Sequence, residues 1–258
     1  MSNKTADIED LLPPKPQAPQ PRDCCGSGCC PCVHDIYEED LRRWKKQCKR
    51  IREGGQEEVP VEGAIQQDKW KDFEIVKIKE ISPNCFCYTF KLQEGQSLGL
   101  KIGQHVIVKQ KKNERNVIRQ YTPISDISER GSFDVFIKIY PNGKITQLIK
   151  DWKVGDNIPW RGPFGNFSYK TNSYKRVLML AAGTGIAPIE EDNSQMKKYN
   201  ETVLFRKLTK DDIKNELLQA PVESTLVLVC GTRSFDKDMV NAAKDAQFML
   251  QSTLTMYL

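Results

Sequence analysis

The sequence predicts an antiparallel β-barrel followed by a parallel α/β domain that is shorter than usual. Between residues 73 and 140, short segments of alternating apolar and polar residues follow one another, a pattern typical of a barrel or sandwich. After Tyr174, continuous apolar runs replace the alternation, as expected for parallel strands that are buried on both faces. Candidate helices lie between and after these runs, which indicates an α/β arrangement.

The barrel is predicted over residues 69–172. Its expected strands are Phe73–Lys79, Cys85–Phe90, His105–Val108 and Ser132–Tyr140. A short helix is expected over Thr146–Trp152, and the two glycines and two prolines of Pro159–Gly165 indicate a rigid turn after a strand.

The α/β domain is predicted over residues 173–258. Its expected strands are Val177–Ala182, Thr202–Phe205 and Thr225–Cys230, and its expected helices are Asp211–Gln219 and Lys237–Phe248. Such domains typically need about 100–150 residues. We therefore expect a truncated domain, in which one strand–helix unit is missing between Gln219 and Thr225.

Three segments are predicted before the barrel. Residues 1–22 contain five prolines among polar residues and indicate an extended, disordered tail. Residues 23–53 combine a cysteine cluster with a helix expected over Asp35–Arg52, in which Glu38 and Glu39 precede Arg42 and Arg43 by four residues. Residues 54–68 are predicted to be a linker.

Composition excludes several classes of protein. The 258 residues carry a net charge of +5, which is too small to imply nucleic-acid binding. No apolar run reaches the length that spans a bilayer, and the polar start predicts no secretory signal, so an intracellular protein is expected. Nine cysteines, an odd number, favour reduced thiols or metal ligands over a disulfide framework. The basic segment Leu41–Arg52 suits a solvated face, an acidic partner or an anionic membrane surface.

The strongest candidate site begins at Arg119 in the sequence R-Q-Y-T-P-I-S. The guanidinium of Arg119 suits a pyrophosphate because its fork makes bidentate contacts. Tyr121 can pack on a flat ring system, and the hydroxyls of Thr122 and Ser125 can reach the same ligand. The alternative interpretation is an edge strand with a proline turn.

Two downstream segments also suit phosphate groups. Gly143, Lys144 and Thr146 open the predicted short helix, whose N-terminus attracts phosphate. Gly183-Thr184-Gly185 follows a predicted buried strand, where glycines allow a tight turn and the close approach of a dinucleotide. The order of R-Q-Y-T-P-I-S, G-K-I-T, R-G-P-F-G, G-T-G-I-A-P and C-G-T along one chain is far more specific than any of these motifs alone.

That order resembles the ferredoxin–NADP reductase superfamily, and within it the flavoprotein pyridine nucleotide cytochrome reductases such as the NADH–cytochrome b5 reductases. The resemblance covers roughly residues 70–248 and implies that the barrel binds FAD and the α/β domain binds NADH. The residues that match the flavin segments are Arg119, Tyr121, Thr122, Ser125, Lys138, Tyr140, Gly143, Lys144 and Thr146.

The resemblance also implies roles at the nicotinamide. Lys138 is implied to act near the nicotinamide nucleotide, and Cys230-Gly231 to face the nicotinamide itself, so Lys138 and Cys230 are the candidate catalytic residues. Gly183, Thr184 and Gly185 match the turn between the domains. The implied electron acceptor is a haem protein such as cytochrome b5, whose acidic surface would be steered towards a basic reductase.

The chain departs from this family at several positions. Thr232 stands where the family usually has proline, and the last ten residues do not resemble the family's terminal strand. NADH binding is therefore less secure than FAD binding. A catalytically impaired flavin-binding protein, acting in binding or regulation, stays open as an alternative.

The cysteine cluster, from Cys24 to Tyr37, resembles an oxidoreductase-like N-terminal motif. Cys25, Cys29, Cys32 and His34 could hold zinc or an iron–sulfur cluster, although their spacing is not a standard one, and a solvent-facing thiol cluster is the alternative. His105 follows a G-Q-H pattern and is expected to be a structural histidine with its hydrogen bonds satisfied.

Overall fold

A computed structural model describes most of the chain in two units, residues 1–62 and residues 63–258. The described residues are 12–24, 32–53, 63–113, 115–165, 167, 173–187, 209–218, 221–246 and 253–257. The predicted strand Thr202–Phe205, residues 1–11 of the predicted tail, and Cys25, Cys29 and Cys30 lie outside them.

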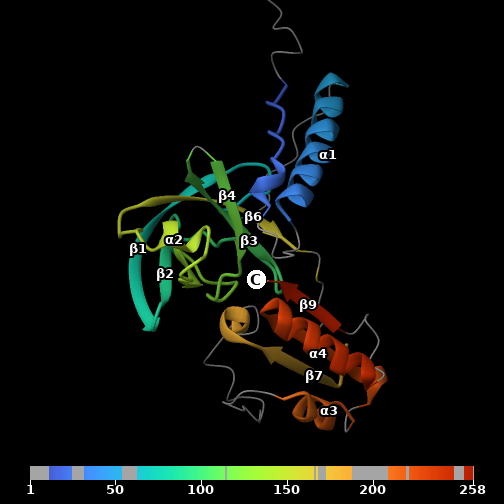
Figure 1. Ribbon diagram of the computed structural model, residues 1–258. Helices are drawn as coiled ribbons and strands as arrows, with labels where there is room; N and C mark the ends of the chain where they lie inside the picture. The colour runs from blue at the N-terminus through green and yellow to red at the C-terminus, as the bar shows by residue number, and fades with distance from the viewer. Residues whose placement is uncertain are drawn as a thin grey trace, which may run out of the picture. The chain divides into compact units, whose positions relative to one another are not determined.

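The N-terminal unit is built around one long helix, α1 (Val33–Arg52), drawn in blue in Figure 1. The helix begins two residues before its predicted start because Asp35 accepts a hydrogen bond from the Cys32 N–H and closes the first turn. Of the predicted i,i+4 pairs, the ion pair between Glu39 and Arg43 forms. A short 3-10 turn, η2 (Pro21–Asp23), precedes the helix, and residues 13–20 have no regular secondary structure.

The second unit begins with the predicted antiparallel sheet, which has six strands in the order β4-β3-β6-β1-β2-β5 (Figure 1). The strands are β1 (Lys71–Ser82), β2 (Cys85–Lys91), β3 (His105–Lys112), β4 (Arg115–Tyr121), β5 (Ser132–Lys138) and β6 (Asn157–Phe164). The helix expected over Thr146–Trp152 is shorter, α2 (Thr146–Ile149). The barrel half of the predicted fold is confirmed.

One prediction within the barrel was wrong. Pro159–Gly165 was expected to be a turn, yet most of it forms β6, which lies between β3 and β1 in the sheet. Pro159 pairs with Asp72 of β1 in the register. The segment stays a strand because Trp160 is fully buried and its neighbours pair on both sides.

The barrel core is aromatic. The rings of Phe90 and Phe133 stack with centroids 5.0 Å apart, and the ring of Trp160 meets that of Phe90 edge-on at 5.1 Å. The predicted linker extends too far, since Ala64 and Ile65 are buried in this core. Their N–H groups donate to the carbonyl oxygens of Ser97 and Leu98, so residues 63–68 belong to the barrel.

The C-terminal sheet is parallel, with three described strands in the order β7-β8-β9. The strands are β7 (Arg176–Ala181), β8 (Thr225–Gly231) and β9 (Thr253–Tyr257); the helices are η3 (Gly183–Ile186), α3 (Lys210–Leu218), η5 (Val222–Ser224) and α4 (Arg233–Asp245). The α/β half of the fold is thus confirmed. The segment 249–258, which does not resemble the family's terminal strand, nevertheless contains β9, paired with β8.

The strands of this sheet differ in burial. Every residue of β8 is buried, as predicted for a central parallel strand. In β7, by contrast, Leu180 is buried while Met179 is 49% exposed. The prediction that both faces of this strand are covered was wrong at Met179: Leu180 packs with Ile213 and Leu217 of α3 on one face, and Met179 points to the opposite face. None of the helices among the described residues combines the length and the apolar character needed to cross a membrane.

Candidate functional site

The first predicted flavin residues lie at the end of β4. The register of β3 and β4 pairs Arg119 with Val108 and Tyr121 with Val106. Arg119 is half-buried, and its Nη1 donates a hydrogen bond to the carbonyl oxygen of Ile118 at 2.7 Å. A guanidinium has five N–H donors, so this single contact fixes the side chain and leaves donors for a ligand.

Tyr121 offers a flat apolar ring and a polar hydroxyl. Its ring meets that of Trp160 edge-on, with the centroids 6.1 Å apart, so the core holds the ring in position. Burial raises the pKa of the Tyr121 phenol above its ordinary value of 10, and the charge of Arg119 partly opposes this rise. The phenol therefore stays protonated and can donate a hydrogen bond at neutral pH.

The rest of the first motif crosses from β4 to β5. Thr122 is buried, and Pro123 forms an isolated bridge with Val135 of β5. Ser125 Oγ accepts a hydrogen bond from the Asp134 N–H at 3.2 Å. Ser125 therefore ties the motif to the strand that leads to the second flavin segment.

The second flavin segment starts at the last residue of β5, the exposed Lys138. Its ammonium lies 5.7 Å from the ring centroid of Tyr140, which is 45% exposed. The Tyr140 N–H donates to Thr146 Oγ1 at 3.2 Å, and the Thr146 hydroxyl donates back to the Tyr140 carbonyl at 3.4 Å. These bonds close the loop that carries Gly143 and the exposed Lys144.

Gly143 is required by this loop. A Cβ atom at this position would stand 2.0 Å from Thr146 Oγ1, so the loop closes only over a glycine. Gly143, Lys144 and Thr146 thus lie in one closed loop. The Thr146 hydroxyl, however, is hydrogen-bonded to the backbone of Tyr140, so Thr146 positions the loop.

The predicted nucleotide residues meet at the carboxyl ends of β7 and β8. The turn η3 holds Gly183, Thr184 and Gly185, and Gly183 has a positive φ of 60°. A Cβ at Gly185 would lie 2.1 Å from the Cys230 carbonyl oxygen and 2.8 Å from Gly231 N. The G-T-G turn therefore rests directly on the backbone of the C-G motif.

Gly231 is equally constrained. A Cβ at this position would stand 2.6 Å from Phe235 Cδ1 and 2.9 Å from Ala182 Cβ. Thr232, where the family usually has proline, caps α4 by accepting a hydrogen bond from the Phe235 N–H at 3.4 Å. This cap explains why α4 begins at Arg233, before its predicted start at Lys237.

Two buried acids lie at this end of β8. Cys230 is fully buried, and burial, aided by the charge of Asp236, raises the pKa of its thiol to about 12. Burial also raises the pKa of Asp236 to about 6, with the Gly231 N–H partly opposing the rise. Within the described part of the chain, neither carboxylate oxygen of Asp236 has a hydrogen-bond partner of good geometry. Sequence reasoning missed Asp236 because nothing in the pattern S-F-D-K marks it as buried.

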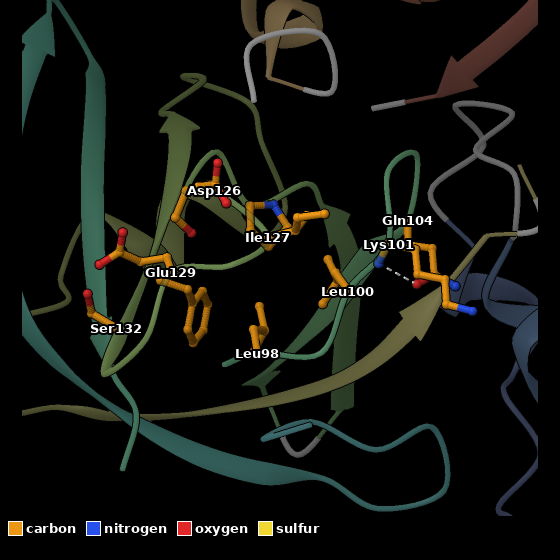
Figure 2. Close-up of a pocket in the computed structure, with 11 residues that line it drawn as sticks. Leu98, Leu100, Lys101, Gln104, Asp126, Ile127, Glu129 and Ser132 are labelled. Atoms are coloured by element: carbon orange, nitrogen blue, oxygen red, sulfur yellow. Dashed lines mark hydrogen bonds between the residues drawn. The ribbon is translucent and has the colours of Figure 1, made fainter. Parts of the chain in front are cut away.

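A pocket of about 370 Å³, counting its open mouth, lies beside Ser125 (Figure 2). Leu98 and Leu100 point into it, while Asp126 and Glu129 stand at one side and Lys101 and Gln104 at the other. The two carboxylates repel phosphate groups, so the pocket does not suit a pyrophosphate. Among the predicted flavin residues, Ser125 is the one that lines it.

His105 differs from its prediction. Its Nε2 is buried and has no hydrogen-bond partner among the described residues, although a satisfied structural histidine was expected. Burial lowers the pKa of His105 to about 4, so the ring is neutral at physiological pH. Gly165 stands close, because a Cβ there would lie 3.5 Å from His105 Nδ1.

These residues fit FAD in two respects. Arg119 is held in place and keeps donors for a pyrophosphate. The loop around Gly143 is closed by Thr146, and this contact fixes the backbone that carries the exposed Lys144, whose ammonium suits a phosphate.

Comparison with known families agrees with this assignment. Residues 72–169 match the oxidoreductase FAD-binding domain, and residues 10–53 match the N-terminal segment of oxidoreductase-like proteins. The prediction of an FAD-binding barrel preceded by an oxidoreductase-like N-terminal motif is confirmed.

Comparison with individual proteins extends the match beyond the barrel. The chain is 39% identical over 189 residues to mouse NADH-cytochrome b5 reductase-like, covering 71% of this chain and 60% of the relative. It is 39% identical over 178 residues to the human protein of that name, covering 68% and 56%. The chain thus spans about three-fifths of these relatives.

Solved structures support the fold. The CS-b5R domains of human Ncb5or superpose with a TM-score of 0.60 at 20% identity, covering 72% of this chain and 69% of that one. A ferredoxin NADP+ reductase from Neisseria gonorrhoeae gives 0.61 at 16% identity, covering 73% and 98%. Both superpositions cover more of the chain than the FAD-binding match alone.

Proposed function

Because the chain belongs to the family of FAD-binding oxidoreductases that includes the NADH-cytochrome b5 reductases, we propose that it oxidises NADH and reduces a haem protein such as cytochrome b5. The observation that carries this proposal is the packing of Gly185 on the carbonyl of Cys230. It preserves a tight glycine turn at the carboxyl edge of the parallel sheet, where dinucleotides bind in open α/β folds.

Arg119 would hold the pyrophosphate of FAD, and Tyr121 would lie against the isoalloxazine or ribityl part. The bridge between Pro123 and Val135 and the hydrogen bond to Ser125 fix the path of this segment between β4 and β5, and Thr122 would reach the same ligand. FAD, when bound, supplies the conversion of hydride transfer into single-electron steps. The chain supplies orientation, and the loop around Gly143 and Lys144 would complete the site.

Lys138 and Cys230 would be the residues closest to the nicotinamide. The exposed Lys138 brings a positive charge that suits a nucleotide phosphate or carboxamide. Cys230 stays a neutral thiol, because burial raises its pKa to about 12. It would therefore shape the nicotinamide pocket and exchange no proton.

Charge on α1 supports the choice of acceptor. The segment Leu41–Arg52 carries seven basic residues and no acidic one. Such a surface speeds encounter with an acidic partner and loses this effect as salt is added. An acidic haem protein is the acceptor that this charge favours.

A second function is favoured by the exposed side chain of Met179 on the C-terminal sheet. Met179 of β7 is 49% exposed, which indicates that this domain lacks covering structure in its described part. A chain with a sound barrel and a weakened nucleotide domain would bind FAD and react slowly with NADH. It would then act as a flavin-binding or regulatory protein.

Reduction of cytochrome b5 separates the two functions. We expect the FAD-loaded chain to reduce cytochrome b5 with NADH, at a rate that falls as ionic strength rises. Changing Lys45, Lys46 and Lys49 together to Gln should slow this step and leave direct reduction of the flavin unchanged. Bound FAD with no NADH-dependent cytochrome reduction would support the second function instead.

A further inference from the structure

The N-terminal unit brings two thiols into contact. Cys24 directly follows the turn η2, and Cys32 directly precedes α1. Their sulfur atoms lie 3.5 Å apart, and the contact is half-buried. The chain between them spans residues 25–31, so a contact at this distance closes a short loop.

Independent contacts hold both sides of this thiol pair. Trp44 of α1 donates a hydrogen bond from Nε1 to the Pro13 carbonyl oxygen at 2.7 Å, and the Lys15 ammonium lies 6.0 Å from the Trp44 ring centroid. On the helix side, the Cys32 N–H donates to the Asp35 carboxylate at 2.7 Å. The segment that carries Cys24 is thus anchored along the same helix that begins after Cys32.

The observed contact involves two sulfur atoms, which is what thiol–disulfide exchange requires. A structural zinc site needs four ligands, so the experiment below also measures bound zinc.

We propose that Cys24 and Cys32 form a reversible dithiol–disulfide pair, oxidised by a small disulfide such as oxidised glutathione. One cysteine thiolate attacks a glutathione sulfur, which forms a mixed disulfide and releases one reduced glutathione. The second cysteine thiolate then attacks the cysteine sulfur of the mixed disulfide and releases the other. Two electrons pass from the two cysteines to the glutathione disulfide, and the two cysteine protons end on the glutathione thiols.

The product would be a covalent link between the extended segment and the first residue before α1. Oxidation would fasten residues 12–24 to the helix, and reduction would leave the hydrogen bond at Trp44 as a reversible contact. This inference concerns the N-terminal unit and stands apart from the proposed reductase activity.

Differential alkylation of the full chain tests the proposal. The reduced protein is equilibrated with reduced and oxidised glutathione, its thiols are blocked, and disulfides are then reduced and given a second label. Trypsin releases the peptide 23–42, in which tandem mass spectrometry distinguishes Cys24, Cys25, Cys29, Cys30 and Cys32. We expect the second label on Cys24 and Cys32 together.

Internal and variant controls keep the result specific. Cys85 and Cys87, half-buried two residues apart on β2, should keep the first label. Cys24→Ser should eliminate the second label on Cys32, and Cys29→Ser should leave the pair intact. Serine is also a good N-cap, so Cys32→Ser should keep α1 folded while eliminating the label on Cys24.

Two results would overturn the proposal. In the first, the second label spreads evenly over the five cysteines of the peptide or persists on Cys32 in Cys24→Ser. In the second, the purified reduced chain carries stoichiometric zinc that is lost in Cys24→Ser, which would make the pair part of a metal site.

Discussion

Gly185 lies so close to Cys230 that a Cβ atom on the glycine would stand 2.1 Å from the cysteine's carbonyl oxygen and 2.5 Å from its carbonyl carbon. Both neighbours are backbone atoms of the buried strand β8, so neither can move aside cheaply. The two motifs expected at the nucleotide site are therefore fitted to each other. A substitution in one motif should therefore disturb the other.

Gly185→Ala should damage the nucleotide site and leave the flavin site intact. Overpacking of this kind typically costs about 1–3 kcal/mol. We expect weaker NADH binding and a lower midpoint for unfolding of the C-terminal domain, at unchanged FAD content. Gly95→Asn is the control, because residue 95 lies in the barrel, has a positive φ that asparagine tolerates and has open space around it. Equal effects of the two changes would contradict the role given to the close contact.

Arg119→Ala should weaken FAD binding. The change removes a charge-assisted contact worth about 1.5–3 kcal/mol, which is about one to two decades in Kd. Titration of the apoprotein with FAD measures the loss. The control is Arg130→Ala, since Arg130 is exposed and donates to the Gly95 carbonyl away from the motif. An unchanged affinity in Arg119→Ala would remove Arg119 from the site.

Thr146→Val should loosen the second flavin loop. Valine keeps the shape of the side chain and loses both hydrogen bonds to the Tyr140 backbone, at a cost of about 1–3 kcal/mol. We expect faster release of FAD on dilution. Thr146→Ser keeps the hydroxyl and should retain FAD as the wild type does. Release at the same rate from all three proteins would show that the loop does not hold the cofactor.

Asp236→Asn should change how stability depends on pH. Burial raises the pKa of Asp236 to about 6 from its ordinary value of 3.8, so the folded state holds a proton that the unfolded state releases. The free energy of unfolding should therefore fall as pH rises from about 4 to about 6 and stay lower above that range. The Asn variant lacks this loss, which we expect to be about 1–3 kcal/mol.

Denaturant titrations at pH 4.5 and 7.5 measure this difference. Asp245→Asn is the matched control, because Asp245 is exposed at the end of the same helix, α4. The Asp236 variant should gain more stability relative to wild type at pH 7.5 than at pH 4.5. An identical pH slope in wild type and in Asp236→Asn would be incompatible with a protonated, buried carboxyl.

The barrel could be predicted from the sequence because apolar and polar residues alternate along its strands. Tyr88 and Phe90 point into the core and Thr89 lies between them, which is the alternation of a half-buried strand. β6 could not be predicted, since Pro159, Gly162 and Pro163 carry the composition of a turn. Burial of Trp160 and pairing on both sides override that local signal.

The residues of the candidate site that belong to a sequence motif could be predicted. Those that stand out only because they are buried could not. Arg119, Tyr121 and Ser125 stand along β4 and its exit as one motif, and their spacing is visible in the chain. The burial of Asp236 and of His105 Nε2, which has no hydrogen-bond partner in the described part of the chain, depends on tertiary packing. The exposure of Met179 depends on which face of the sheet the helices cover, which a single apolar run does not show.

Anaerobic mixing of the FAD-loaded chain with NADH tests whether NADH reduces the bound flavin. The absorbance of the bound flavin is followed in the stopped flow, with Gly185→Ala as the matched variant at equal FAD content. We expect rapid bleaching of the flavin in the wild type and slow bleaching in the variant. A flavin that stays bound and keeps its full absorbance in the wild type would contradict the proposed oxidation of NADH.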